Sequence, residues 1–155
     1  MAVQPIPEGY HSLTPYLAVD DAAAAIDFYK RAFGAEETTR MPMEDGKIAH
    51  AQLKIGDSQL MLSDPMEQSS VRPPNETGSP TSSIFMYVEN VDAVVEQAVA
   101  AGATVTMEVQ DAFWGDRWGT ITDPFGHLWS VATHVEDVPP EEMAERAKTA
   151  MSEMG

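Results

Sequence analysis

The chain has 155 residues, 43% hydrophobic and 22% charged, which suits one folded domain spanning residues 1–155. Its net charge of −16 argues against nucleic-acid binding. No apolar run approaches the roughly 20 residues of a membrane helix, and the start MAVQPIPEG lacks a signal-peptide pattern. We therefore expect a cytoplasmic protein that binds neither nucleic acid nor membrane. The absence of cysteine excludes disulfides, thiolate metal ligands and a cysteine nucleophile.

The first half of the chain, residues 11–64, predicts one strand, one helix and three further strands. An apolar strand opens at Tyr16 and ends at Asp20 and Asp21, which are good residues for the N-cap of a helix. The turn Gly56-Asp57 predicts a tight hairpin between the last two strands. The expected helix is 22–33, and the expected later strands are 36–41, 48–55 and 59–63.

The second half, residues 83–135, repeats this order. Val88 corresponds to Val19 at an offset of 69 positions, and both helices are followed by a Gly-Ala pair that predicts a glycine C-cap. Asp-Pro-Phe-Gly, residues 123–126, predicts the last turn. The expected helix is 91–101, and the expected later strands are 104–109, 117–122 and 128–133.

Two further segments lie outside the repeat. Residues 65–82 are rich in proline, serine and glycine, which indicates a surface loop that serves as a linker or as a lid over a site. Residues 139–154 predict a C-terminal helix, with Pro140 and early acids at its start and an apolar stripe of methionines and alanine.

The repeat and its motifs resemble one large family. The segments TPYLAVDDAAAAIDFYKRAFGAE, HAQLKIGDSQLMLSD and WGDRWGTITDPFGHLWSVATHVEDV are similar to the vicinal oxygen chelate (glyoxalase/bleomycin resistance/dioxygenase) superfamily, and most similar to its PhnB-like branch. The resemblance implies an α+β fold in which two β-α-β-β-β modules form open, curled mixed sheets. It also implies a small-molecule ligand and a homodimer as partners.

Metal-dependent members of this family hold a divalent ion with His, Glu or Gln from the first and last strand of each module. The corresponding positions here are Thr14, Met61, Ser83 and Ser130. Hydroxyls and a thioether are poor donors for such ions. We therefore expect no metal cofactor, with a divalent metal at displaced positions as the alternative.

The turns predict which side chains face the cavity. A two-residue turn at Gly56-Asp57 pairs Gln52 with Met61 and places His50 on the same face. If residues 123–126 form the second loop, Arg117 shares the inward face of Ser130, whereas Trp118 and Trp129 face the helices. The predicted ligand-binding residues are Tyr16, His50, Gln52, Met61, Phe85, Tyr87, Trp114, Arg117 and Ser130.

This interior predicts binding of a small, partly aromatic organic molecule. Phe85, Tyr87 and Trp114 would stack on the ligand, and Arg117 and His50 would orient it. One alternative is a lyase, isomerase or dioxygenase-like enzyme of the glyoxalase type, with a non-standard metal site or His50 as general base. Another is a barrel filled by its own side chains.

Overall fold

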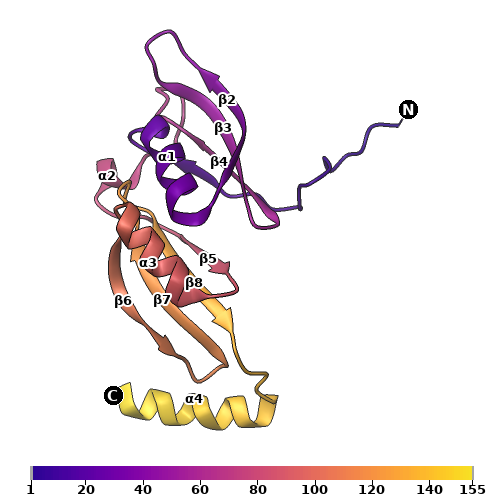
Figure 1. The fold of residues 1–155 in the computed structure, drawn as a ribbon, viewed down its shortest axis with the longest axis vertical. Coiled ribbons are helices and arrows are strands. Elements are labelled where there is room, and N and C mark those ends of the chain that lie inside the picture. The colour runs from indigo at the N-terminus through magenta and orange to yellow at the C-terminus, as the bar shows by residue number, and fades with distance from the viewer. Residues whose placement is uncertain (1, 155) are drawn as a thin grey trace.

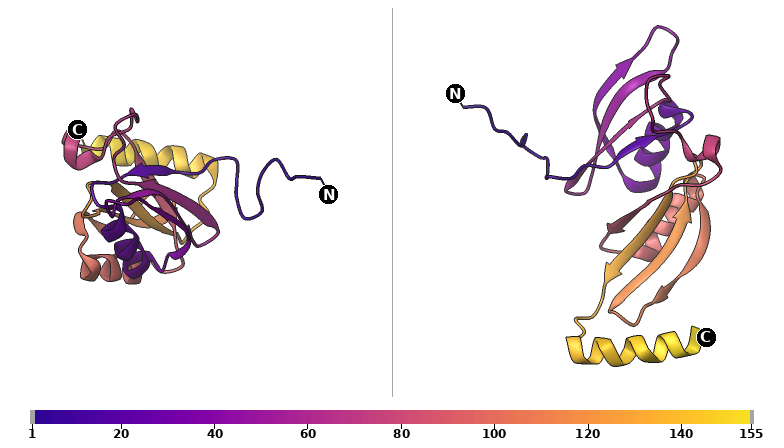
Figure 2. Two further views of the ribbon diagram at one scale, coloured as in Figure 1. Left: turned by 90° about the horizontal axis from the view of Figure 1, so that it is seen from above. Right: turned by 180° about the vertical axis from the view of Figure 1, so that it is seen from behind.

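The computed structural model describes residues 2–154 and contains two β-α-β-β-β modules (Figure 1). The two modules lie end to end along the long axis of the molecule, the residues before β1 run away from the body, and α4 lies at the opposite end (Figures 1 and 2). The elements of the first module are β1 (Tyr16–Ala18), α1 (Ala22–Phe33), β2 (Glu36–Pro42), β3 (Ile48–Ile55) and β4 (Ser58–Ser63).

The second module repeats the first, and the expected fold class is confirmed. Its elements are β5 (Ser83–Tyr87), α3 (Val91–Ala101), β6 (Thr104–Asp111), β7 (Asp116–Thr122) and β8 (Leu128–His134). The strand orders are β1-β4-β3-β2 and β5-β8-β7-β6, with the first pair parallel and the others antiparallel in each sheet. Strands β1 and β5 therefore each leave one edge without a hydrogen-bonded neighbour within the described residues.

The repeat extends to the hydrogen bonds that begin each helix. The side chains of Asp21 and Asn90 accept a hydrogen bond from the backbone N–H three residues later. The N–H of the first helical residue donates to Asp64 in the first module and to Thr133 in the second. Each helix start is thus tied to the end of the last strand of its own module, which fixes the helix over one face of the sheet.

The segment between the modules contains a short helix that the sequence did not predict. Helix α2 (Pro74–Thr77) begins after Pro73 and ends at Gly78. Asn75 in this helix donates to Asp20 and to the carbonyl of Pro124, so it contacts both modules. Among residues 2–154, no helix is both long and apolar enough to span a membrane.

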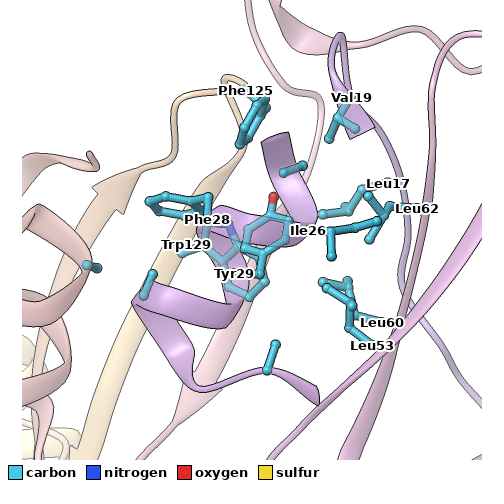
Figure 3. Close-up of a cluster of buried hydrophobic side chains, with 14 of the residues drawn as sticks. Leu17, Val19, Ile26, Phe28, Tyr29, Leu53, Leu60, Leu62, Phe125 and Trp129 are labelled. Carbon is cyan, nitrogen blue, oxygen red and sulfur yellow. The ribbon is translucent and has the colours of Figure 1, made fainter. Parts of the chain in front are cut away.

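The core lies around α1. Figure 3 shows Ile26, Phe28 and Tyr29 of α1 between the leucines of the first sheet and Phe125 and Trp129 of the second module. The hydroxyl of Tyr29 donates to the buried carboxylate of Asp123 at 2.5 Å. Burial, followed by the charge of Asp123, raises the pKa of Tyr29 well above its usual range. A single apolar cluster, with this bond inside it, therefore joins the two modules.

Asp123 organises the last turn of the chain. One of its carboxylate oxygens accepts from the backbone N–H groups of Phe125 and His127, and the other accepts from Tyr29 and the Trp129 indole. The N–H of Asp123 in turn donates to the carbonyl of His127 at 2.9 Å. His127 is the last residue of this turn, and its Nε2 lies 2.8 Å from the carbonyl oxygen of Ala18 in the first module.

This turn has five residues, and the sequence-based register of β7 and β8 was wrong by one position. Thr122 pairs with Leu128 and Thr120 with Ser130, because Asp123 bridges to His127 and not to Gly126 alone. A shift of one residue moves every side chain of a strand to the opposite face. Arg117 therefore faces the helix layer and Trp118 faces away from it, which reverses both predictions.

The C-terminal helix α4 (Pro140–Met154) is confirmed, and it has no fully buried residue. Arg146 attaches it to the body by donating to the Phe113 carbonyl and to the carboxylate of Glu136. The hydrogen bonds that Arg146 donates to Glu136 and Glu142 raise the pKa of Arg146, so its charge is fixed. Met151 and Met154, at the end of the predicted apolar stripe, are exposed.

Candidate functional site

Each sheet carries a helix on one face and leaves the other face open. We call these the first open face, built from β1, β3 and β4, and the second open face, built from β5, β7 and β8. Large apolar side chains remain exposed there: Tyr16 is 48% exposed, Phe85 47% and Tyr87 61%. The predicted site residues are divided between the two faces, which belong to separate sheets within one chain.

On the first open face, the predicted hairpin register is confirmed. Gln52 pairs with Met61, and Tyr16 pairs with Met61 from the other side. Residues of the segment before β1, together with Gln52 and Met61, line an open groove of about 650 Å³ beside this face. The residues that line the groove are Pro5, Ile6, Pro7, Tyr10, His11, Ser12, Thr14, Gln52 and Met61.

His50 lies beside this groove with both ring nitrogens occupied. Its Nδ1 is 3.0 Å from the Tyr16 hydroxyl, and its Nε2 is 3.0 Å from the Gln52 amide nitrogen. The Gln52 carbonyl oxygen in turn accepts from the Tyr10 hydroxyl. Since Gln52 donates to Nε2, the neutral ring carries its proton on Nδ1, and no lone pair is left free for a general base. The contacts favour a positioning role for His50 over catalysis.

The second open face carries a continuous group of aromatic rings. The Phe85 ring stacks on Trp118 with a centroid distance of 6.2 Å and an interplanar angle of 18°. Trp118 also contacts Trp114 at 5.2 Å, and Phe85 contacts Tyr87 at 5.2 Å. We call these four residues the aromatic platform. Ser130 lies under it, paired with Phe85 on one side and Thr120 on the other.

A buried carboxylate anchors one end of the aromatic platform. Asp116 is 1% exposed and accepts hydrogen bonds from the Tyr87 hydroxyl at 2.8 Å, the Trp114 indole at 3.0 Å and His134 Nδ1 at 2.8 Å. Burial alone would raise the pKa of Asp116, but the hydrogen bonds from His134, Tyr87 and Trp114 outweigh it and lower that pKa. The bond to Asp116 raises the pKa of Tyr87. The carboxylate is therefore charged, and it fixes two rings of the platform.

His134 balances the charge of Asp116. Its other nitrogen, Nε2, lies 2.7 Å from Asp137, whose side chain is fully exposed. The hydrogen bonds to Asp137 and then to Asp116 raise the pKa of His134, which favours the imidazolium form. Nδ1 is thus directed into the protein by a buried partner, and Nε2 is directed towards solvent at the edge of the platform.

Arg117 does not belong to either open face. It donates to both oxygens of Asp92 at the start of α3, at 2.8 and 2.9 Å, and to Asp111 at 3.3 Å. These hydrogen bonds raise the pKa of Arg117 above its usual value, so the guanidinium stays charged. The prediction that Arg117 orients a ligand in the cavity was therefore wrong in its geometry.

The donor set of the family's metal positions does not fit a divalent ion. The register places Met61 beside Tyr16 and Ser130 beside Phe85, with Thr14 and Ser83 two residues before these aromatics. All four positions thus belong to the open faces, but they present only hydroxyls and a thioether. In the described part of the chain, residues 2–154, no three His, Cys, Asp or Glu side chains are grouped so as to hold a metal.

Sequence reasoning missed three residues of the second open face: Asp116, Trp118 and His134. The alternation of β7 contains the signal, since Asp116, Trp118 and Thr120 are two residues apart and share a face. A five-residue turn at 123–127 would have assigned that face correctly. The four-residue turn expected at 123–126 reverses this assignment.

Comparisons with known proteins agree with this architecture. Residues 10–131 match the model of the Glyoxalase/Bleomycin resistance protein/Dioxygenase superfamily. An uncharacterised protein of Mycobacterium tuberculosis H37Rv is 44% identical over 148 residues, which cover 93% of this chain and 84% of that protein. The crystal structure of TioX from Micromonospora sp. ML1 is 29% identical with a TM-score of 0.64, covering 83% of this chain and 100% of that one.

The PhnB protein from Bacillus cereus, also described as a putative 3-demethylubiquinone-9 3-methyltransferase, shares the fold. It is 18% identical with a TM-score of 0.63 and covers 79% of this chain and 99% of that one. The family model covers both modules, and the relatives match most of their own length. The chain therefore belongs to the glyoxalase/bleomycin resistance protein/dioxygenase superfamily.

Proposed function

We propose that this protein binds a small, planar organic molecule on the aromatic platform, without a catalytic metal. The observation that supports this most is the platform itself: four aromatic rings linked by successive ring contacts on an open face, two of them fixed through a buried carboxylate. Rings held in this way lose little conformational entropy when a flat ligand stacks on them. A monomer that exposes such a surface has a ligand or a partner to cover it.

The proposal includes a homodimer in which the second copy encloses the ligand on the aromatic platform. In one chain the two open faces are separate, and each sheet ends in a free edge at β1 or β5. A second copy can place its first open face, with Tyr16 and His50, over the platform. Ligand and partner would then bury the exposed aromatic area together. Hydrogen bonding of β1 or β5 to a strand of the second copy would also cover a free sheet edge.

The proposed function is tested by isothermal titration calorimetry with a neutral planar probe, naphthalene-2-carboxamide, on protein purified without chelator. We expect saturable binding with a Kd on the order of 0.1 to 1 mM. We also expect well under one Zn, Ni, Mn or Fe ion per chain by elemental analysis, and the same Kd after treatment with EDTA. Absence of saturable binding, or binding that requires one metal ion per chain, would reject the proposal in favour of a filled or metal-dependent site.

A further inference from the structure

The pair formed by Asp116 and His134 is the feature of the second open face that stacking alone does not explain. A carboxylate that is 1% exposed needs a compensating charge or full hydrogen bonding. Asp116 has both, because Tyr87 and Trp114 donate to one oxygen and His134 donates to the other. With Nδ1 committed to Asp116, His134 presents Nε2–H as its remaining donor.

The backbone around His134 is fixed as firmly as its ring. The N–H groups of Val135 and Glu136 both donate to the carbonyl of Gly115, which directly precedes Asp116. Gly115 has a φ of +103°, and a Cβ there would lie 2.1 Å from the Glu136 carbonyl oxygen, so only glycine allows this contact. The outward direction of Nε2 is therefore set by the fold.

The present partner of Nε2 is a carboxylate that nothing else in the described residues holds. Asp137 Oδ1 lies 2.7 Å from His134 Nε2, and the Asp137 side chain is fully exposed. A pair of this kind between exposed groups adds little to stability. An oxyanion of a ligand can therefore replace the Asp137 carboxylate with only a small loss of folding stability.

The distance from His134 to the aromatic platform suits one ligand for both. His134 pairs with Asp116 and Ala132 pairs with Trp118, so His134 lies two residues beyond the Trp118 position on the same face. Two residues along a strand span about 7 Å, which is close to the length of a fused aromatic ring system with one substituent. A ring over Trp118 can therefore extend its substituent to Nε2.

Resting on the proposed function, we infer that the preferred ligand is an aromatic acid, whose oxyanion accepts a hydrogen bond from His134 Nε2 in place of Asp137 while its ring stacks on the platform. Charge-assisted N–H···O⁻ bonds are about twice as strong as neutral ones, which makes the oxyanion the source of specificity. The net charge of −16 repels anions at long range, but salt at 0.1 M screens this beyond about 10 Å.

The test compares three probes that share one ring system: 2-naphthoate, naphthalene-2-carboxamide and 2-naphthylmethylammonium. Calorimetry on the wild-type chain at 0.15 M salt is expected to give a Kd for 2-naphthoate at least about tenfold lower than for the other two. His134→Gln keeps an N–H donor but removes the charge, and it is expected to abolish this preference. Asp137→Asn removes the competing carboxylate and is expected to tighten 2-naphthoate about three- to tenfold.

Asp27→Asn is the matched control, because it changes the net charge by the same amount at an exposed residue of α1 that pairs only with Arg31. It is expected to leave all three affinities unchanged. Equal effects of Asp27→Asn and Asp137→Asn on 2-naphthoate, or tighter binding of the amide or the ammonium probe, would overturn the inference and leave the proposed function intact. Failure of all three probes to bind would overturn both. If His134→Gln does not fold, the comparison of the two aspartate variants decides alone.

Discussion

Asp123→Asn is expected to lower the free energy of unfolding by about 2–4 kcal/mol. The Asp123 carboxylate is 3% exposed and accepts four hydrogen bonds, from Tyr29, Trp129 and the backbone N–H groups of Phe125 and His127. An amide nitrogen in place of one oxygen would face two donors. The Tyr29 hydroxyl can rotate to accept, but an indole or backbone N–H has no such freedom, so a buried donor is left without a partner.

Urea denaturation followed by circular dichroism measures this loss. The matched control is Asp57→Asn, which changes the turn aspartate of the first module, an exposed residue whose carboxylate accepts within residues 2–154 only from the Ser58 hydroxyl. We expect the control to stay within about 0.5 kcal/mol of the wild-type chain. Similar values for the two variants would show that Asp123 does not join the modules in the way described above.

Trp118→Leu is expected to weaken binding of naphthalene-2-carboxamide by at least about tenfold, which corresponds to about 1.4 kcal/mol. Trp118 is the ring that contacts both Phe85 and Trp114, so its removal interrupts the platform in the middle. Leucine retains apolar contact but offers no flat surface for stacking. Calorimetric titration of the folded variant provides the measurement.

The control for Trp118→Leu is Arg117→Gln, its immediate neighbour on the strand. Arg117 pairs with Asp92 on the helix side, so its replacement is expected to leave the Kd unchanged. The sequence-based register predicts the opposite, with Arg117 in the cavity and Trp118 outside it. Loss of binding in Arg117→Gln with unchanged binding in Trp118→Leu would therefore support the sequence-based register of β7 and β8.

Most of the fold could be predicted from the sequence because local signals agree with the repeat. The N-cap pair Asp21 and Asn90 and the glycines after both helices define the helices, and a two-residue turn at Gly56-Asp57 sets the register of the first hairpin. In each case a short segment decides its own geometry. The pairing of Gln52 with Met61 on the first open face was predicted correctly for the same reason.

The second open face was assigned wrongly, because its register depends on whether the turn that begins at Asp123 has four or five residues. The turn takes in His127 because the N–H of His127 donates to the Asp123 carboxylate and the N–H of Asp123 donates to the His127 carbonyl. The same carboxylate also accepts from Tyr29, 94 positions earlier in the chain. The link between Asp116 and His134 then follows from the register, since these residues face each other across β7 and β8. The alternation of β7 groups Asp116 with Trp118, but only the correct register shows that His134 lies opposite Asp116.

The indole N–H resonances of the three tryptophans report directly on where the ligand binds. They can be assigned with Trp→Phe variants in a ¹H–¹⁵N correlation spectrum and followed while naphthalene-2-carboxamide is added. Trp114 and Trp118 lie on the platform, whereas the Trp129 indole is buried against Asp123 and serves as an internal reference. We predict that the Trp118 and Trp114 signals shift in a saturable manner while that of Trp129 stays in place. Saturable binding that moves neither platform signal would contradict the assignment of the ligand site to the second open face.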